Sequence, residues 1–209
     1  AFLVVTGDLA DRAEDAAYKH LRAELDRCVL NNHLIIGNHD NRATFTHYFP
    51  TTPIDENGFV QYAIETSFGV LLMLDTVKAL SHGGEYCEIR RQWLSDKLAE
   101  HADQPVFLFM HHPPFDLHLP CLDAIGLEDQ HLFAEAISIH RNIRHIFFGH
   151  AHRPLSGSWL RWPFSSLRGT NHQVKLDFTT ESIIYYDEPP EYSVVFVNDA
   201  SVVVHTHTY

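Results

Sequence analysis

The feature that most constrains this chain is a set of four polar clusters, each placed directly after an apolar run. The runs cover residues 2–5, 34–36, 106–110 and 146–148, and the clusters are Gly7-Asp8-Leu9-Ala10-Asp11, Gly37-Asn38-His39-Asp40, His111-His112-Pro113-Pro114 and Gly149-His150-Ala151-His152. Short apolar runs bounded by turn residues are typical of buried strands. In open α/β sheets the ligand site lies beyond the carboxyl ends of the strands, so we expect all four clusters to meet at one edge.

The side chains in these clusters offer carboxylate, amide and imidazole groups but no thiol. Such oxygen and nitrogen donors suit divalent manganese, iron, cobalt or zinc. His150 and His152 are two residues apart, so on an extended segment both face the same side. The competing explanations are a helix N-cap for Asp8 and a structural asparagine in a left-handed turn for Asn38.

The order of the four clusters resembles that of the calcineurin-like metallophosphoesterase superfamily. Within it, the chain is most similar to the class III cyclic-nucleotide phosphodiesterases and the related glycerophosphodiesterases. The likeness extends to Gly84-Glu85, ahead of residues 91–94, and to residues 169–174, and it covers nearly the whole chain. It implies a four-layer α/β/β/α sandwich, a single metallophosphoesterase domain over residues 1–209, and two divalent metal ions as cofactors.

The resemblance also assigns metal ligands by residue. It makes Asp8 the bridge between the two ions, because one carboxylate has two oxygen atoms. Asn38, His111 and His150 then belong to the second ion, and His152 belongs to the first. Pro113 and Pro114 fix the backbone just past His111, which suits a rigid ligand.

The resemblance gives catalytic roles to Asn38 and His39. Asn38 also reaches a phosphate oxygen, and His39 faces the leaving group as the candidate general acid. We expect Asp11 to cap a helix or support a neighbour rather than bind metal, and His112 to be structural or to orient a ligand. Asp40 either holds an imidazole in one tautomer or closes its turn, and both possibilities stay open.

Polar residues in loops near the expected edge are weaker candidates for the substrate pocket. They are His82, His118, Asp123, Asn171 and His172. Loop residues of this kind are more often simply solvated, so none is assigned a role.

One part of the family pattern is absent from these residues. Related proteins carry a strand ending in Asp-x-His a few dozen residues before the first cluster, and both residues bind the first ion. We expect either that these 209 residues are an amino-terminally incomplete piece of a longer protein or that this copy has lost half of one metal site.

The remaining chain predicts alternating elements followed by strands. Helices are expected near 17–28, 43–49, 89–101 and 129–140, and Asp129 is expected to cap the last of them. A hairpin is expected at 59–66 and 70–75. Further strands are expected at 158–162, 173–178, 193–197 and 201–207. The loops 75–88 and 115–128 are long for a compact domain and are expected to be lids or binding loops.

Charge, apolar runs and cysteine spacing indicate what the protein does not bind and where it works. The formal charge of −12 argues against a nucleic-acid surface, which would show clustered Lys and Arg. No apolar run approaches the roughly 18 residues of a membrane-spanning helix. Cys28, Cys87 and Cys121 lack CxxC spacing, which indicates reduced thiols in a cytoplasmic protein. Tyr185-Tyr186 and the apolar run 194–197 predict a homodimer.

The expected function is hydrolysis of a small phosphodiester. By resemblance, a 3′,5′-cyclic nucleotide such as cAMP comes first, and glycerophosphodiesters or phosphomonoesters come second. Two ions about 3.5–4 Å apart stabilise both the attacking and the leaving oxygen of an in-line displacement. The alternatives are a non-catalytic scaffold of the same fold that binds a protein, and a structural zinc domain, which is weaker because such sites favour cysteine.

Overall fold

Strands and helices alternate through most of the chain, and strands alone follow. The computed structural model describes residues 1–209. The helices are α1 (Asp15–Arg27), α2 (Arg42–Tyr48), α3 (Glu88–Glu100), α4 (Pro120–Asp123) and α5 (Gln130–Ser138). The strands are β1 (Phe2–Thr6), β2 (Asn31–Ile35), β3 (Tyr62–Thr66), β4 (Gly69–Met73), β5 (Val106–Met110), β6 (Ile143–Phe148), β7 (Leu155–Trp159), β8 (Trp162–Ser166), β9 (Gln173–Val174), β10 (Tyr185–Tyr186), β11 (Glu191–Val197) and β12 (Val202–Thr208).

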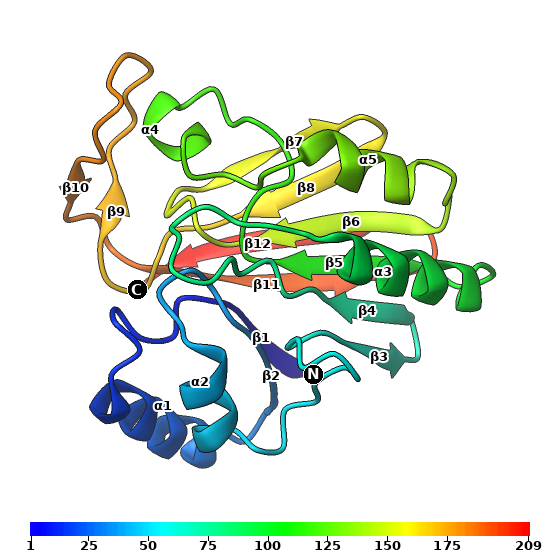
Figure 1. Ribbon diagram of the computed structural model, residues 1–209, viewed down its shortest axis with the longest axis horizontal. Helices are drawn as coiled ribbons and strands as arrows, with labels where there is room; N and C mark the ends of the chain where they lie inside the picture. Colours follow the sequence, from blue (N-terminus) through cyan, green and yellow to red (C-terminus); the bar gives the residue numbers. More distant parts are fainter.

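A six-stranded sheet forms the centre, in the order β3-β4-β5-β6-β8-β7 (Figure 1). Strands β4, β5, β6 and β8 are parallel, and the edge strands β3 and β7 run antiparallel to them. Val70 and Leu71 are both buried although they point to opposite faces, as expected for parallel strands covered on both sides. The parallel arrangement brings the carboxyl ends of β5 and β6 to the same edge.

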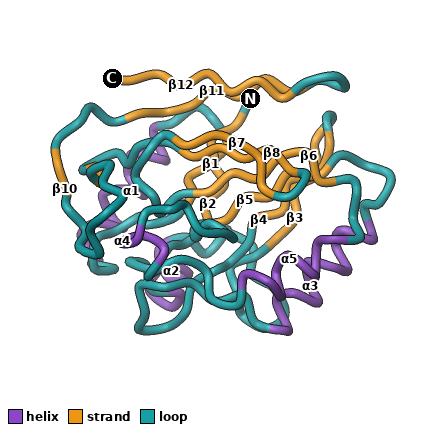
Figure 2. The backbone as a smooth tube through the Cα atoms, turned by 90° about the horizontal axis from the view of Figure 1, so that it is seen from above, coloured by secondary structure: helices purple, strands orange, loops and turns teal.

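Helices cover one face of this sheet and further strands cover the other. Leu98 of α3 and Phe133 of α5 belong to the large core cluster on the first face. On the second face, Phe107 and Phe147 pack with Val204 of β12. Figure 2 shows β11 and β12 on the opposite side of the central strands from α3 and α5.

The second β layer consists of separate two-stranded sheets. β1 pairs in parallel with β2, with Thr6 opposite Ile35, so the segments that follow both strands emerge side by side. β11 pairs antiparallel with β12. Tyr18 of α1 and Phe45 of α2 share a buried cluster with Leu34 of β2, which places these helices against the β1–β2 pair. The predicted α/β/β/α class is thereby confirmed.

Three of the predicted local structures are wrong. The expected strand at 158–162 contains a turn, because Leu160 has φ +55° and reverses the chain between β7 and β8. The strand expected at 173–178 is limited to Gln173–Val174. Asp129 precedes α5 with φ +51° and makes no side-chain cap hydrogen bond. In each case backbone turn geometry overrode a pattern of apolar or capping residues.

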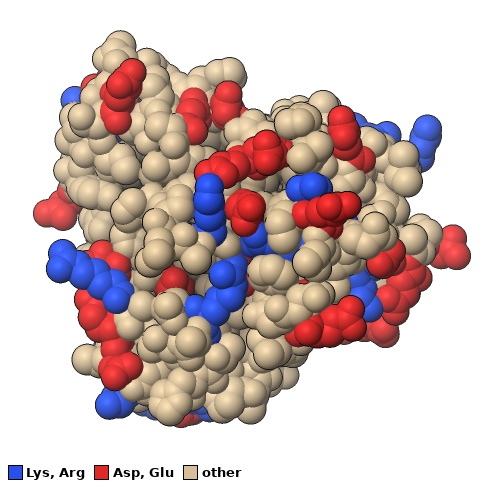
Figure 3. Space-filling model, viewed as in Figure 1, with Lys and Arg blue, Asp and Glu red and all other residues tan.

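The surface has no large basic area on the face that Figure 3 shows, where acidic and basic side chains are interspersed. This distribution agrees with the excess of acidic over basic residues, 27 against 15. None of the helices combines the length and the apolar character needed to span a bilayer.

A buried ion pair lies just past β4. Asp75 is fully buried, and both of its carboxylate oxygens accept hydrogen bonds from Arg42 at 2.7 Å. The carboxylate also accepts from the backbone N–H of Val60 at 2.9 Å and of Val77 at 3.0 Å. This carboxylate therefore joins α2 to the segments that flank the β3–β4 hairpin.

We expect Asp75→Ala to lower the free energy of unfolding by about 3–5 kcal/mol, because it leaves a partly buried Arg42 and two backbone donors without their partner. Asp26→Ala is the matched control: Asp26 also pairs with an arginine through both oxygens, but it is 55% exposed. Removing such an exposed pair costs less than about 1 kcal/mol. Urea unfolding of both variants measures this, and equal losses would contradict the organising role of Asp75.

Candidate metal centre

The first predicted ligand, Asp8, stands on a tight turn directly after β1. Gly7 and Asp8 both have positive φ, +94° and +55°. Non-glycine residues adopt this conformation rarely, and such strain clusters at functional sites. A Cβ at position 7 would lie 2.5 Å from Nδ1 of His111, so only glycine fits there. The turn directs Oδ2 of Asp8 to within 3.2 Å of Nε2 of His111.

Asp40 closes the turn that follows β2. Its carboxylate accepts hydrogen bonds from the backbone N–H of Gly37 at 2.8 Å and of Leu9 at 3.1 Å. It also accepts one from the hydroxyl of Tyr18 at 2.7 Å. Of the two roles left open for Asp40, the structure therefore shows the turn-closing one. Through Leu9 the same carboxylate ties this turn to the one after β1.

His111, the first residue after β5, has oxygen atoms at both of its ring nitrogens. Nδ1 is 2.7 Å from the carbonyl oxygen of Thr6, so Nδ1 carries a proton and donates it. Nε2 lies 3.2 Å from Oδ2 of Asp8 and 3.1 Å from Oδ1 of Asn38. In the neutral ring Nε2 holds a lone pair, so it faces two oxygens with no proton between them. A second proton or a cation resolves this arrangement.

The pKa values of His111 and Asp8 reflect the same contact between Nε2 and the carboxylate. Burial alone would lower the pKa of His111, but the adjacent Asp8 carboxylate, the carbonyl of Thr6 and Asp40 together outweigh burial and raise it. Burial would raise the pKa of Asp8, but His111 outweighs it and holds the pKa of Asp8 well below its usual range. Without a cation, the pair is therefore stabilised by a proton on His111.

His150 approaches the same amide oxygen from β6. Its Nδ1 is 2.9 Å from Oδ1 of Asn38, and its ring centroid is 5.1 Å from that of His111. Burial, together with the nearby His111, lowers the pKa of His150 to about 3. The ring is therefore neutral at pH 7, which is the form that binds metal ions.

These four donor atoms form a continuous row of close contacts. From Asp8 to His111, Asn38 and His150, the successive distances are 3.2, 3.1 and 2.9 Å. In tetrahedral coordination, donors about 2.1 Å from one ion stand about 3.4 Å apart, which is near these contact distances. One carboxylate oxygen, one amide oxygen and two imidazole nitrogens also suit a divalent transition metal. The chemistry and the close contacts of these residues therefore suit a divalent ion, and their assignment to the second ion stays a prediction.

His152, the fifth predicted ligand, is held separately. Its Nδ1 is 2.7 Å from the carbonyl oxygen of His172, which fixes the tautomer and leaves Nε2 free to bind a metal. The ring nitrogens that lie within 4.8 Å of one another belong to His111, His112 and His150, and not to His152. The structure thus fixes the ring of His152 without joining it to the other two histidines, and its role as a ligand stays a prediction.

His112 lies beside the centre, but both of its ring nitrogens have other partners. Nδ1 is 2.8 Å from Oγ1 of Thr76, and Nε2 is 3.1 Å from the carbonyl oxygen of His82. Burial, followed by the neighbouring His150, lowers its pKa well below the usual value. His112 therefore connects the loop after β4 to the strand that carries His111, in agreement with its expected supporting role.

His39 stands next to Asn38 and is oriented by Asp11. Its backbone N–H donates to Oδ1 of Asp8 at 3.0 Å. Its Nδ1 is 2.6 Å from the carbonyl oxygen of Asp11, whose carboxylate lies 3.6 Å away. Asp11 therefore supports His39 rather than capping α1, for which the N-cap residue is Glu14.

Two of the weaker pocket candidates lie at this centre. Nδ1 of His82 is 3.2 Å from Nδ2 of Asn38, and its ring is 5.5 Å from that of His39. His172 contacts His152 through its carbonyl and its ring. The loop 75–88 thus reaches the site, as expected for a binding loop.

The other three candidates do not join the site in the same way. Asp123 accepts a hydrogen bond from the backbone of Leu117 at 2.7 Å and supports its loop. His118 lines a separate hollow of about 360 Å³ with Trp159. Asn171 is exposed.

Sequence reasoning missed the carbonyl oxygens of Thr6 and His172, which fix the tautomers of two ligands. Backbone atoms leave no trace in a residue pattern, so no signal pointed to them. It also missed Tyr185, whose ring contacts that of His172. The Tyr185-Tyr186 pair predicted a dimer contact instead.

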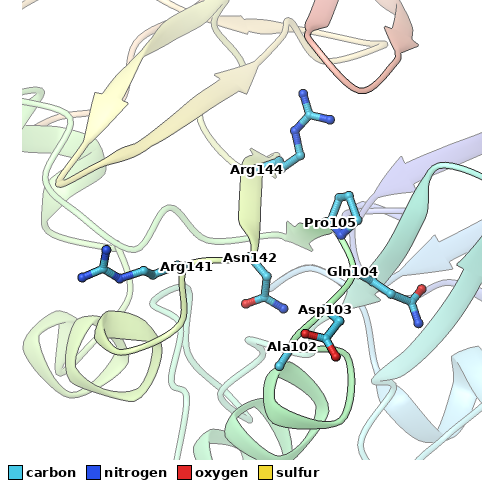
Figure 4. Close-up of a pocket in the computed structure, with 7 residues that line it drawn as sticks. All are labelled: Ala102, Asp103, Gln104, Pro105, Arg141, Asn142 and Arg144. Atoms are coloured by element: carbon cyan, nitrogen blue, oxygen red, sulfur yellow. The ribbon is translucent and has the colours of Figure 1, made fainter.

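A hollow of about 300 Å³ at the opposite end of the sheet is not part of this centre. It lies at the amino-terminal ends of β5 and β6 (Figure 4). Its two arginines, Arg141 and Arg144, point away from each other. No set of converging groups forms there.

Known proteins have sequences related to that of this chain. The family model for calcineurin-like phosphoesterases matches residues 1–154. A probable cyclic nucleotide phosphodiesterase of Rhodopseudomonas palustris is 41% identical over 209 residues, which are 98% of this chain and 76% of that protein. A glycerophosphodiester phosphodiesterase of Enterobacter lignolyticus is 29% identical over 192 residues, which are 90% of this chain and 68% of that protein.

Among solved structures, a dimetal phosphatase from Danio rerio has the same fold. It superposes with a TM-score of 0.65 at 19% identity and covers 79% of this chain and 71% of that chain. The family match, the relative at 41% identity and the fold all confirm the resemblance found in the sequence. The chain therefore belongs to the calcineurin-like phosphoesterase family and is a hydrolase of phosphoric esters.

Proposed function

We propose that this chain hydrolyses small phosphodiesters at a centre of two divalent metal ions, with a 3′,5′-cyclic nucleotide such as cAMP as the first candidate substrate. The observation that carries the proposal is the convergence of Asp8, Asn38, His111 and His150 beside His39. The name of the relative in R. palustris supports a cyclic nucleotide. The name of the relative in E. lignolyticus supports glycerophosphodiesters as the second candidate.

The ligand assignment gives the two ions unequal support. Asp8, Asn38, His111 and His150 would hold one ion of manganese, iron, zinc or cobalt. Asp8 and His152 would contribute to the other, which needs further ligands beyond these residues. When bound, such ions lower the pKa of water from 15.7 toward about 7 and stabilise the attacking and leaving oxygens.

Residues of the chain then donate a proton to the leaving group and bind the phosphoryl oxygens. Water releases a proton to solvent and adds to phosphorus as hydroxide, and the bond from phosphorus to the leaving alkoxide breaks. His39 gives a proton to that alkoxide, while Asp11 holds its Nδ1 at 2.6 Å and keeps the ring in place. The Nδ2 amide of Asn38 can donate to a phosphoryl oxygen, because its Oδ1 already faces His111 and His150.

The remaining expectations about location and assembly stay predictions. The three cysteines are free, as a reducing cytoplasm requires. β11 leaves Val194, Val195 and Phe196 exposed, which is the surface on which the predicted homodimer rests. A monomeric mass in light scattering at micromolar concentration would count against that dimer.

A hydrolysis panel tests the proposed function. Metal-reconstituted protein should be assayed on cAMP, on a glycerophosphodiester and on glycerol 3-phosphate as the phosphomonoester. We expect both diesters to be hydrolysed faster than the monoester, and activity to disappear with a chelator. Faster hydrolysis of the monoester would replace the proposal with a phosphomonoesterase.

We expect metal-free protein to bind about one equivalent of Mn²⁺ tightly, and His150→Ala to weaken that binding by at least about 100-fold, since even outer partners of metal ligands contribute 10–100-fold. His145→Ala is the matched control, because His145 is also buried but lies within β6 and contacts Oγ of Ser165 instead. Isothermal titration measures both. Two tight equivalents, or equal losses in the two variants, would refute the ligand assignment.

We expect His39→Ala to keep the metal affinity but to lower kcat by about 10²–10⁴-fold on diesters with an alkoxide leaving group, which needs a proton most. A nitrophenolate leaves well without a proton, so its release should fall much less. His47→Ala, an exposed histidine on α2, is the control and should change neither rate. Equal losses on both substrates would show that His39 does not act as the general acid.

A further inference from the structure

We propose that Tyr185, backed by His172, forms a stacking surface for the base of a nucleotide substrate. The inference rests on the proposed function and names the part of the site that would recognise a nucleoside. It assigns a binding role to two aromatic residues that the hydrolytic steps do not use.

The turn that presents His172 is built rigidly around a metal ligand. Gln173 is fully buried, and its side chain bonds both the N–H and the carbonyl of Gly169 at 2.9 Å. A Cβ at position 169 would lie 2.9 Å from Nδ1 of His152. The same turn provides the carbonyl that accepts the proton of His152. The ring of His172 therefore has a fixed position relative to the metal centre.

The rings of His152, His172 and Tyr185 form a row from the metal centre to solvent. The ring of His172 stacks on that of His152 with a centroid distance of 4.9 Å and an interplanar angle of 26°. The ring of Tyr185 meets that of His172 edge-on at 4.3 Å. Tyr185 is 52% exposed. One end of the row is thus a metal ligand and the other is an open aromatic surface.

Tyr185 stands on the side of its hairpin that faces the centre. It pairs with Val174 across β9 and β10, and Figure 1 shows this pair at the end of the molecule where β5 and β6 end. Burial, followed by the carboxylates of Asp11 and Asp8, raises the pKa of Tyr185. The influence of these two carboxylates agrees with a position at the same edge of the sheet.

The arrangement fits a nucleotide better than a glycerol ester. In a cyclic nucleotide a single sugar separates the phosphorus from the base, and two ring contacts separate His152 from Tyr185. Exposed aromatic side chains stack on any base, because every base has a π face. A glycerophosphodiester with an aliphatic alcohol carries no ring, so Tyr185 would add nothing to its binding.

The test compares three variants on two diesters. We expect Tyr185→Ala to raise the KM for cAMP by about 5- to 150-fold, the range of base–aromatic stacking, with little change in kcat. The KM for glycerophosphoethanolamine should stay unchanged. Tyr185→Phe should restore the KM for cAMP. Tyr186→Ala is the matched control, since Tyr186 is similarly exposed but points to the opposite face of β10.

A second measurement removes the dependence on catalysis. Adenosine has the base but no phosphate, so it should inhibit the wild-type protein competitively and lose this effect in Tyr185→Ala. If cAMP is hydrolysed but Tyr185→Ala leaves its KM unchanged, the stacking surface is refuted while the proposed function stands. A change in the mass of the protein with equal losses on both diesters would instead make Tyr185 a contact between copies and overturn the inference.

Discussion

The site depends on one unfavourable contact between atoms that all carry lone pairs. The carbonyl of Thr6 takes the only proton of neutral His111, and Nε2 then faces the oxygens of Asp8 and Asn38 at 3.2 and 3.1 Å. Buried polar atoms need a partner, so this arrangement is stable only with an added proton or a cation. A divalent ion could accept lone pairs from Nε2 of His111 and from both oxygen atoms, whereas a proton on Nε2 could be donated mainly to one of them. The geometry of the surrounding turns follows from holding these atoms together.

The fold brings the donors together through strand ends and glycines. Asp8, Asn38 and His150 are far apart in sequence, but each follows a strand that ends at the same edge. A Cβ at position 37 would collide with Asp8 and with His111, so glycine is required for the turns to close. Asp8, His150 and His152 all have positive φ. Such strain costs on the order of 1–3 kcal/mol per residue. At Asp8 it is held by the hydrogen bond from the neighbouring Leu9 to Asp40, and at His152 by the contact of its ring with the carbonyl oxygen of His172.

The sequence was sufficient to predict the fold class and the contacts among Asp8, Asn38, His111 and His150, because polar clusters after buried strands constrain both. It was insufficient where a contact depends on backbone atoms or on a choice between equal alternatives. The carbonyls that orient His111 and His152 carry no residue signal. The role of Asp40 was undecided until its partners were known. The turn at Leu160 was hidden because an apolar residue occupies a left-handed position that favours glycine or asparagine.

The most direct test of the central claim is anomalous diffraction from crystals grown with Mn²⁺. The ligand assignment predicts a strong peak about 2.0–2.3 Å from Oδ2 of Asp8, Oδ1 of Asn38, Nε2 of His111 and Nδ1 of His150, the usual range for such donors. A peak bound instead by His112 or by surface carboxylates would contradict the ligand assignment. The absence of any peak, with Nε2 of His111 still 3.2 Å from Asp8, would show that a proton alone holds the pair together.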